Sequence, residues 1–332
     1  MNAWLQKQWY CLGFWHLLLA PLAWLFWLVS GLRRLCYQVG LFRSYKLPVP
    51  VVVVGNISVG GTGKTPLVIW LAKELKKQGY SPAIISRGYG ANYSANSPIA
   101  VNADSNPNVV GDEPVLLAKR CHCPVWVGRN RFKIAQALLM AHPECNVIIS
   151  DDGLQHYKLQ RDFEISVVDG SRGLGNGWPL PAGPLREPAS RLKTVDAVVY
   201  NGEKHNGGEP ALNAFSMKLE GRIFHNLLDP TKTAQTTAFA EKSICAIAGI
   251  GNPARFFQQL SDLGLKFASQ FFPDHHAFRL ADLQNIKADV MLMTEKDAVK
   301  CAAFAEAHWW YLSVNAVVDE VLVTRVINKI GN

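Results

Sequence analysis

The sequence VVVVGNISVGGTGKTP, from Val51 to Pro66, determines the fold predicted for this chain. Its four consecutive valines are typical of a strand buried on both faces, as in a parallel sheet. A glycine-rich turn follows, and Lys64 and Thr65 open a predicted helix that runs to Gln78. A strand, a glycine turn with Gly-Lys-Thr and a helix, in this order, form a phosphate-binding loop. The stretch therefore predicts a P-loop NTPase-like α/β lobe.

Each residue type in this loop suits phosphate binding. Glycines let successive backbone N–H groups turn inward around phosphate oxygens, and the helix N-terminus adds its positive end. Lys64 is expected to reach the β- and γ-phosphates of a nucleotide, and the Thr65 hydroxyl to ligate Mg²⁺. Ser58 stands where the usual pattern has glycine, so an ordinary glycine-rich turn is the alternative. The predicted nucleotide-binding residues are Ser58, Val59, Gly60, Gly61, Thr62, Gly63, Lys64 and Thr65.

The length and charge of the chain limit its class. With 332 residues it is long enough for two domains. A net charge of +8 suits nucleic acid, an anionic membrane surface or a phosphorylated substrate. The seven cysteines are scattered, and the cluster of Cys121, His122 and Cys123 lacks the second pair that a zinc site needs. We therefore expect reduced cysteines in a cytosolic body.

The amino-terminal stretch carries a second strong signal. Gln8 to Leu32 contain no Asp, Glu, Lys or Arg and are rich in Trp, Leu and Phe; this is longer than the ~20 residues that cross a hydrocarbon core. Basic residues follow, beginning with Arg33 and Arg34, and they place the body of the protein on the cytoplasmic side. We expect a membrane-associated helix that spans the bilayer or lies in it, with a buried core helix as the alternative.

Acidic residues accompany two of the predicted elements downstream. The apolar strand 146–150 delivers Asp151 and Asp152 to the sheet edge, where P-loop enzymes complete their Mg²⁺ site. Asp112, in the sequence GDEP, precedes an apolar helix. It is either the N-cap of that helix or a functional carboxylate, acting as a base or through a metal, and the residues alone leave both alternatives open.

A long loop and a predicted hairpin separate this lobe from the rest of the chain. The Gly- and Pro-rich stretch 171–191 contains Arg172, Arg186 and Arg191. We interpret it as a lid that brings guanidinium groups to phosphates, with a solvated surface loop as the alternative. Residues 215–219 and 222–228 flank Glu-Gly and predict a connecting hairpin.

A second α/β series closes the chain. It comprises a strand at 243–248, a helix at 254–263 and a strand at 266–271, followed by FPDHHAF, which contains His275 and His276. Two adjacent histidines beside an aspartate are either a structural pair or part of a site. Residues 294–297, TEKD, loosely match the guanine-reading motif of GTPases, but the lysine is one place late. A strand at 310–314 and a helix at 318–330 are predicted at the end.

Taken in order, the motifs closely resemble those of the tetraacyldisaccharide 4′-kinase family of lipid A biosynthesis in Gram-negative bacteria. They are SVGGTGKTP, SRGYG, GDEP, VGRNR, DDGLQH, PAGPLREP, GIGNP, FPDHHAF and TEKDAVK, after an apolar amino-terminal helix. Ser58 fits, because the loop of this family begins with Ser or Thr. The resemblance implies two Rossmann-like lobes, the second smaller, with a hairpin linker. The expected bounds are 1–35 for the membrane-associated helix, 36–205 for the P-loop kinase lobe, 206–240 for the linker and 241–332 for the C-terminal lobe.

The resemblance also implies a reaction and roles for residues. The γ-phosphate of ATP would move to the 4′-hydroxyl of an acylated glucosamine disaccharide 1-phosphate, at the cytoplasmic side of the inner membrane. Asp112 matches the catalytic base, and His275 matches the histidine that assists it, with His276 left as an alternative. The remaining expected residues are Glu113, Asp151 and Asp152 around Mg²⁺, Arg131 and Arg186 on the phosphate side, and Gln155 and His156 along the same edge. No obligate protein partner is expected.

Two other classes of function are weaker alternatives. A membrane-tethered P-loop switch protein would share the phosphate loop, but it does not need a second acidic and histidine-containing cluster in a separate lobe. Nucleic-acid binding would use the positive charge, but the basic residues form no patch interleaved with aromatic residues.

Overall fold

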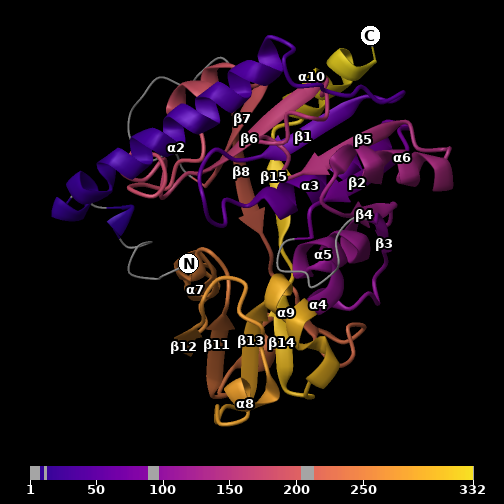
Figure 1. Ribbon diagram of the computed structural model, residues 1–332. Helices are drawn as coiled ribbons and strands as arrows, with labels where there is room; N and C mark the ends of the chain where they lie inside the picture. Colours follow the sequence, from indigo (N-terminus) through magenta and orange to yellow (C-terminus); the bar gives the residue numbers. More distant parts are fainter. Residues whose placement is uncertain (1–7, 11–12, 89–96, 203–212, 332) are drawn as a thin grey trace.

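The computed structural model describes residues 8–10, 13–88, 97–202 and 213–331 and folds into two α/β lobes (Figure 1). Part of the predicted membrane segment (1–7 and 11–12), of the SRGYG motif (89–90) and of the predicted linker (206–212) lies outside these residues. The predicted two-lobed α/β architecture is confirmed.

The large lobe is built on a nine-stranded sheet. Its strand order is β15-β8-β7-β6-β1-β5-β2-β4-β3, parallel except for β15 on β8 and β3 on β4. All five residues of β1 are buried, as its valines predict. The strands are β1 (Val51–Gly55), β2 (Pro82–Ser86), β3 (Ile99–Val101), β4 (Val125–Val127), β5 (Val147–Asp151), β6 (Phe163–Asp169), β7 (Ala197–Asn201), β8 (Ala214–Glu220) and β15 (Asn315–Val318).

Helices cover both faces of this sheet and bury its apolar side chains. One core packs α3, α5 and α10 against the sheet, and a second core packs α6 against the other face. The short helix α4 precedes α5, and a 3₁₀ turn at Ala189–Lys193 precedes β7. The helices are α3 (Lys64–Lys77), α4 (Pro107–Val110), α5 (Asp112–Cys121), α6 (Arg131–Ala141) and α10 (Val321–Ile330).

The small lobe has a six-stranded sheet in the order β10-β9-β14-β13-β11-β12, with β14, β13, β11 and β12 parallel. Apolar side chains pack on both faces of this sheet as well. Its strands are β9 (Phe224–Asn226), β10 (Thr233–Ala234), β11 (Ile244–Ala248), β12 (Ala268–Phe271), β13 (Val290–Thr294) and β14 (Trp309–Leu312). Its helices are α7 (Pro253–Asp262), α8 (Leu280–Leu283) and α9 (Glu295–Cys301), with 3₁₀ turns at Thr236–Phe239 and Ala302–Phe304.

The connection between the lobes differs from the predicted hairpin and from the predicted domain bounds. β8 and β9 lie in different sheets: β8 pairs with β7 and β15, and β9 pairs with β14 and β10. The chain crosses after β8 and returns after β14, so β15 and α10 belong to the large lobe (Figure 1). The two crossing segments lie so close that a Cβ at Gly221 would be 2.2 Å from the carbonyl oxygen of Ser313.

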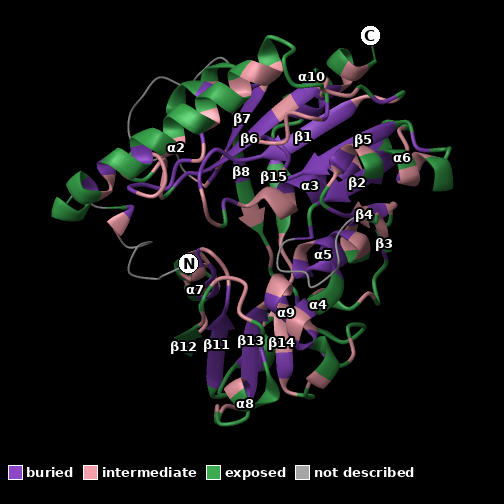
Figure 2. Ribbon diagram, in the orientation of Figure 1, coloured by how far each residue is buried: buried purple, intermediate pink, exposed green. Residues whose placement is uncertain are grey.

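The amino-terminal helix α2 (Phe14–Gln38) lies along one side of the large lobe (Figure 1). Its most apolar window has a mean hydropathy of 1.6, and only 17% of that window is buried. Figure 2 shows the exposure along most of its length. By length and composition the helix can cross a membrane. Because most of its apolar side chains are exposed, the buried core helix is excluded as an interpretation of this segment.

Candidate active site

The candidate site residues gather where the carboxyl ends of parallel strands in both sheets face each other. In the large lobe these are the loop after β1 and the segment after β5; in the small lobe they are the turns after β11, β12 and β13. Ligands of open α/β sheets bind at this edge. The backbones touch here: a Cβ at Gly251 would lie 2.4 Å from the amide nitrogen of Gly61.

The phosphate loop has the backbone that its glycines predict. Gly60 and Gly63 have φ values of 113° and 94°, a region that favours glycine, and α3 begins at Lys64. Asn56 Nδ2 donates to the Gly60 carbonyl at 3.5 Å and to Thr62 Oγ1 at 3.4 Å. The amide of Val59 donates to the carbonyl of Pro184 at 2.8 Å, which ties the phosphate loop to the loop 171–191.

Asp151 and Asp152 lie at the end of β5 in two different environments. Asp151 is buried and accepts from Ser86 Oγ at 2.9 Å. Burial, with the charges of Glu113 and Asp152, raises the pKa of Asp151 to about 7. Burial also raises the pKa of Asp152, but the positive charges of Lys64, Arg186 and Arg131 together outweigh burial and hold this pKa well below its usual range. Lys64 Nζ is 3.4 Å from Asp152 Oδ1.

Asp112, the first residue of α5, meets residues of the small lobe. Its Oδ2 lies 3.7 Å from His275 Nδ1 and 3.9 Å from Lys296 Nζ. Lys296 Nζ is also 3.0 Å from Glu113 Oε1. Burial would raise the pKa of Asp112, but Lys296 and His275 outweigh it and keep the pKa below its usual range. The carboxylate therefore stays ionised, as a general base requires.

The two adjacent histidines have different surroundings. His275 has a positive φ of 58° and faces Asp112. His276 Nε2 is 3.0 Å from Asp282 Oδ2, and its ring stacks on Phe272 and meets Phe278 edge-on. Geometry thus favours His275 as the partner of Asp112 and gives His276 a structural role in the small lobe.

Arginines surround residues 153–156, the loop that follows Asp152 at the edge of the sheet. Arg131 is buried, and its Nη2 donates to the Asp151 carbonyl at 2.5 Å. Gln155 Nε2 donates to the carbonyl of Asn56, which ties this loop to the phosphate loop. Burial lowers the pKa of His156 to about 3, with further lowering by four arginines at positions 131, 161, 33 and 87. His156 is therefore neutral at physiological pH, within a strongly positive field.

The loop 171–191 is fastened to the phosphate loop. The amide of Arg186 donates to the carbonyl of Ile57 at 2.7 Å, and Arg186 Nη1 is 3.4 Å from Asp152 Oδ2. Arg172 Nη1 donates to the carbonyl of Gly251 at 2.5 Å, across the lobe boundary. Arg186 thus lies beside Asp152 and the phosphate loop, whereas Arg172 contacts the backbone of the small lobe.

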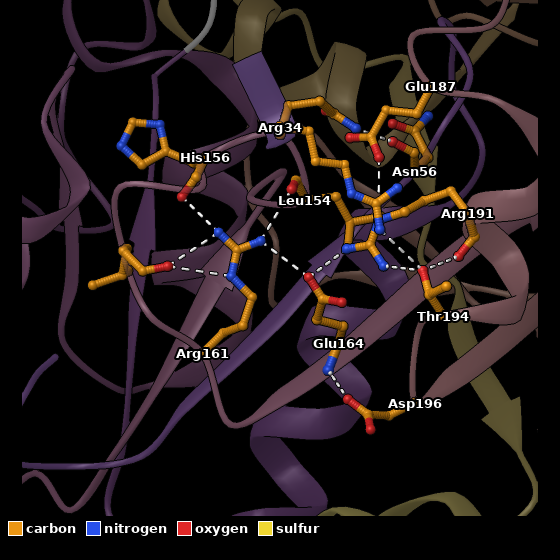
Figure 3. A network of polar contacts seen from close by, with 12 residues as sticks. Arg34, Asn56, Leu154, His156, Arg161, Glu164, Glu187, Arg191, Thr194 and Asp196 are labelled. Carbon is orange, nitrogen blue, oxygen red and sulfur yellow. Dashed lines mark hydrogen bonds and ion pairs between the residues drawn. The ribbon is translucent and has the colours of Figure 1, made fainter. Parts of the chain in front are cut away.

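Arg191 is buried between two glutamates, which corrects its predicted place in a lid (Figure 3). Its Nη2 is 2.5 Å from Glu164 Oε1, and its Nε is 3.1 Å from Glu187 Oε2. Arg161 joins the same network, donating to Glu164 and to the carbonyls of Leu154, His156 and Leu159 (Figure 3). Sequence spacing did not separate Arg191 from Arg186, because both follow the same proline-rich stretch.

Two contacts across the lobe boundary have no counterpart in the sequence predictions. Asp169, at the end of β6, is 2.6 Å from Arg255 Nη2 and 3.1 Å from Asn252 Nδ2. The other contact is made by Lys296, whose TEKD motif predicts only a loose likeness to GTPases. The carboxylates of GDEP and of Asp274 are the sequence signal that indicates a buried cation.

The comparisons with known proteins show the family to which the chain belongs. The family model described as tetraacyldisaccharide-1-P 4′-kinase matches residues 15–331. A tetraacyldisaccharide 4′-kinase of Methylobacillus flagellatus is 50% identical over 99% of this chain and 96% of its own, and one of Dechloromonas aromatica is 48% identical over 98% and 97%. The crystal structure of LpxK from Aquifex aeolicus in complex with ATP superposes with a TM-score of 0.79 at 29% identity, covering 95% of this chain and 99% of that one. The chain belongs to the tetraacyldisaccharide-1-P 4′-kinase family.

Proposed function

We propose that this kinase binds ATP on the loop between β1 and α3 and phosphorylates its lipid acceptor where the two lobes meet. As a member of its family, the enzyme transfers the γ-phosphate of ATP to the 4′-hydroxyl of tetraacyldisaccharide 1-phosphate in lipid A biosynthesis. The observation that carries the site assignment is the 3.7 Å approach of His275 Nδ1 to Asp112 Oδ2, beside the phosphate loop.

Asp112 is assigned as the general base and His275 as its assistant. Phosphoryl transfer needs little covalent chemistry from the protein, but it needs an oriented acceptor and neutralised charge. A carboxylate that stays ionised can accept the proton of the acceptor hydroxyl as the phosphorus–oxygen bond forms. The imidazole of His275 is within reach to orient that carboxylate and to share the proton.

The residues fit a magnesium ion that is shared with the nucleotide. Within the described ranges, no group of three or more His, Cys, Asp or Glu side chains can hold a metal by itself. Mg²⁺, however, usually keeps waters and binds through one or two carboxylates together with substrate phosphates. Asp151 Oδ1 is buried without a hydrogen-bond partner, which suits a cation. Asp151 and Asp152, with Thr65 and the neighbouring Glu113, would hold the ion, which supplies charge neutralisation of the phosphates.

The basic residues of the site suit its anionic ligands. Lys64 and Arg186 each pair with one oxygen of the Asp152 carboxylate. Lys64 Nζ is 3.4 Å from Oδ1, and Arg186 Nη1 is 3.4 Å from Oδ2. Arg131 and the field around His156 lie at the adjoining edge. Gln155 fixes that edge to the phosphate loop. Both ATP and the acceptor carry phosphate, so a positive lining on both sides of Asp152 lowers the free energy of the bound state.

Helix α2 is proposed to dock the enzyme on the cytoplasmic face of the inner membrane. Its exposed side chains are large and apolar, and its last turns touch the catalytic lobe: Arg33 Nη1 donates to the Gln155 carbonyl at 3.4 Å, and Arg34 Nη2 to Thr194 Oγ1 at 3.3 Å. An acylated substrate resides in the bilayer, so this arrangement presents its head group near the phosphate loop.

A transfer assay tests the proposal. Purified full-length enzyme in detergent is incubated with Mg²⁺, labelled ATP and tetraacyldisaccharide 1-phosphate, and the lipid product is separated. Label in a lipid bisphosphate, lost in Lys64→Met and retained in Lys287→Met on the exposed surface of the small lobe, supports the proposal. Hydrolysis of ATP without label in the lipid would contradict it.

A further inference from the structure

Lys296 is the one ammonium group that the described residues place among three carboxylates from both lobes. Its Nζ is 3.0 Å from Glu113 Oε1, 3.9 Å from Asp112 Oδ2 and 3.9 Å from Asp274 Oδ1. The first two belong to the large lobe, and Asp274 belongs to the small lobe. The side chain of Lys296 is 17% exposed, so these contacts are largely shielded from solvent.

The position of Lys296 in its helix is unfavourable without these partners. It is the second residue of α9, whose N-terminus is capped by Thr294 Oγ1 accepting from the amide of Asp297 at 3.1 Å. The N-terminal turn carries the positive end of the helix dipole and favours acidic residues. A lysine there therefore destabilises the isolated helix, and the three carboxylates offset that cost.

The contact with Asp274 links Lys296 to the shape of the histidine turn. Asp274 Oδ1 also accepts from the amide of His275 at 3.1 Å. That residue adopts a φ of 58°, which non-glycine residues rarely do and which its surroundings must hold in place. Lys296 thus holds one carboxylate that shapes the turn carrying His275 and another, Asp112, that His275 faces.

We propose that Lys296 is a positioning residue that assembles the pair of Asp112 and His275 across the lobe boundary. Its ammonium neutralises carboxylates that would otherwise repel one another, and so keeps the histidine turn against α5. The inference rests on the proposed role of Asp112 as base. Lys296 acts through that residue and does not touch the reacting atoms.

A second ion pair across the boundary provides the matched control. Arg120 Nη1 lies 2.5 Å from Glu295 Oε2, and its guanidinium also donates to Ser313 and Asn315. This pair joins α5 to α9 but contacts neither Asp112 nor His275. Removing Arg120 weakens the lobe contact alone, whereas removing Lys296 also disturbs the catalytic pair.

The test is a double-mutant cycle of Lys296→Met with Asp112→Ala in full-length enzyme. We expect Lys296→Met to lower kcat about 100-fold with the KM for ATP nearly unchanged, since misplacing a reacting group by ~1 Å costs this much. In the Asp112→Ala background, Lys296→Met should lower the residual rate less than about threefold. The reason is that the carboxylate through which Lys296 acts is already absent. Arg120→Met should change the rate by equal factors in both backgrounds. The kcat of Lys296→Arg should be about tenfold higher than that of Lys296→Met, because arginine returns the positive charge.

Three outcomes are decisive. Multiplicative losses in Lys296→Met and Asp112→Ala would overturn the positioning role, and so would a kcat of Lys296→Met equal to that of the unmodified enzyme. If the Met variant does not fold, as thermal unfolding will show, Lys296→Gln is used in the same cycle. A full rate in Asp112→Ala alone would instead contradict the assignment of the base, which separates failure of the proposed function from failure of this inference.

Discussion

Nδ1 of His275 lies 3.7 Å from Oδ2 of Asp112, although the two side chains belong to different lobes. Asp112 reaches this place because it is the first residue of α5, and His275 because it follows β12 in a turn with positive φ. The proposed catalytic pair is divided between the lobes in this way and exists only while the lobes are together. The proposed mechanism therefore couples the chemistry to the contact between the lobes.

The base assignment predicts a selective loss in Asp112→Ala. Its kcat should fall by about 10³-fold, within the range of general-base contributions, while the dissociation constant for ATP stays the same. The physical reason is that the phosphate loop lies on another segment and is left intact. Nucleotide titration and single-turnover transfer measure the two quantities separately. Retention of the transfer rate would disprove the assignment.

The two histidines should respond differently to substitution. His275→Asn is expected to lower kcat about 10- to 100-fold, because it removes the group that orients the base. His276→Asn should lower the unfolding temperature while changing kcat less than about threefold, since its ring pairs with Asp282 and packs on Phe272 within the small lobe. Steady-state kinetics on folded fractions of both variants provide the comparison. The reverse order of effects would reassign the catalytic histidine.

Local patterns explain why much of this fold could be predicted. The valine run, the glycine loop and the aspartates after β5 depend on residues close in sequence, and each is where the pattern places it. The N-cap alternative for Asp112 remained open because its neighbours in space come from the other lobe. The contacts of Lys296 and Asp169 escaped prediction for the same reason.

Strand pairing between distant segments could not be predicted. The local pattern of β8 predicts half of a hairpin, but its antiparallel partner is β15, from the end of the chain. The two segments that cross between the lobes pack against each other at Gly221 and Ser313. This packing brings β15 beside β8, where it covers a sheet edge that would otherwise be unpaired. The C-terminal helix α10, which follows β15, consequently packs on the large lobe, although β14 before them belongs to the small lobe.

The neutral His156 predicts a pH dependence of stability. Its pKa is about 3 in the folded state, lowered by burial and by arginines, against about 6.5 in the unfolded chain. Between these two pKa values the unfolded state binds more protons than the folded state. The stabilisation that His156 contributes is therefore fully present above pH 6.5 and is lost as the pH falls toward 3. Urea midpoints at pH 7, 6 and 5 should fall less steeply in His156→Gln than in the unmodified enzyme. His142→Gln, at a more exposed site, is the control, and equal slopes for all three proteins would contradict the prediction.

Arg191 should be important for stability rather than for catalysis. Its side chain is 3% exposed and pairs with Glu164 and Glu187, so Arg191→Met leaves Glu187 without its cation and Glu164 with Arg161 alone. Breaking a buried pair in this way costs about 3–5 kcal/mol of unfolding free energy. Lys329→Met, which breaks the half-exposed pair with Asp196, should cost less than about 1 kcal/mol. Urea unfolding monitored by circular dichroism measures both, and similar costs would show that the network of Figure 3 is not buried in solution.

Membrane docking through α2 predicts that charges on its exposed face release the enzyme from lipid. Trp24 and Leu28 are 61% and 66% exposed and lie one helical turn apart on the same face. Replacing both with Glu should move the enzyme from the lipid fraction to the soluble fraction in flotation with anionic vesicles, because each charge costs about 2–3 kcal/mol inside the bilayer. Val317→Glu changes a half-exposed apolar residue on β15 and should leave flotation unchanged. Transfer to substrate in detergent should persist in the double variant, since the substitutions lie outside the site. Continued flotation of that variant would show that another surface holds the enzyme on the membrane.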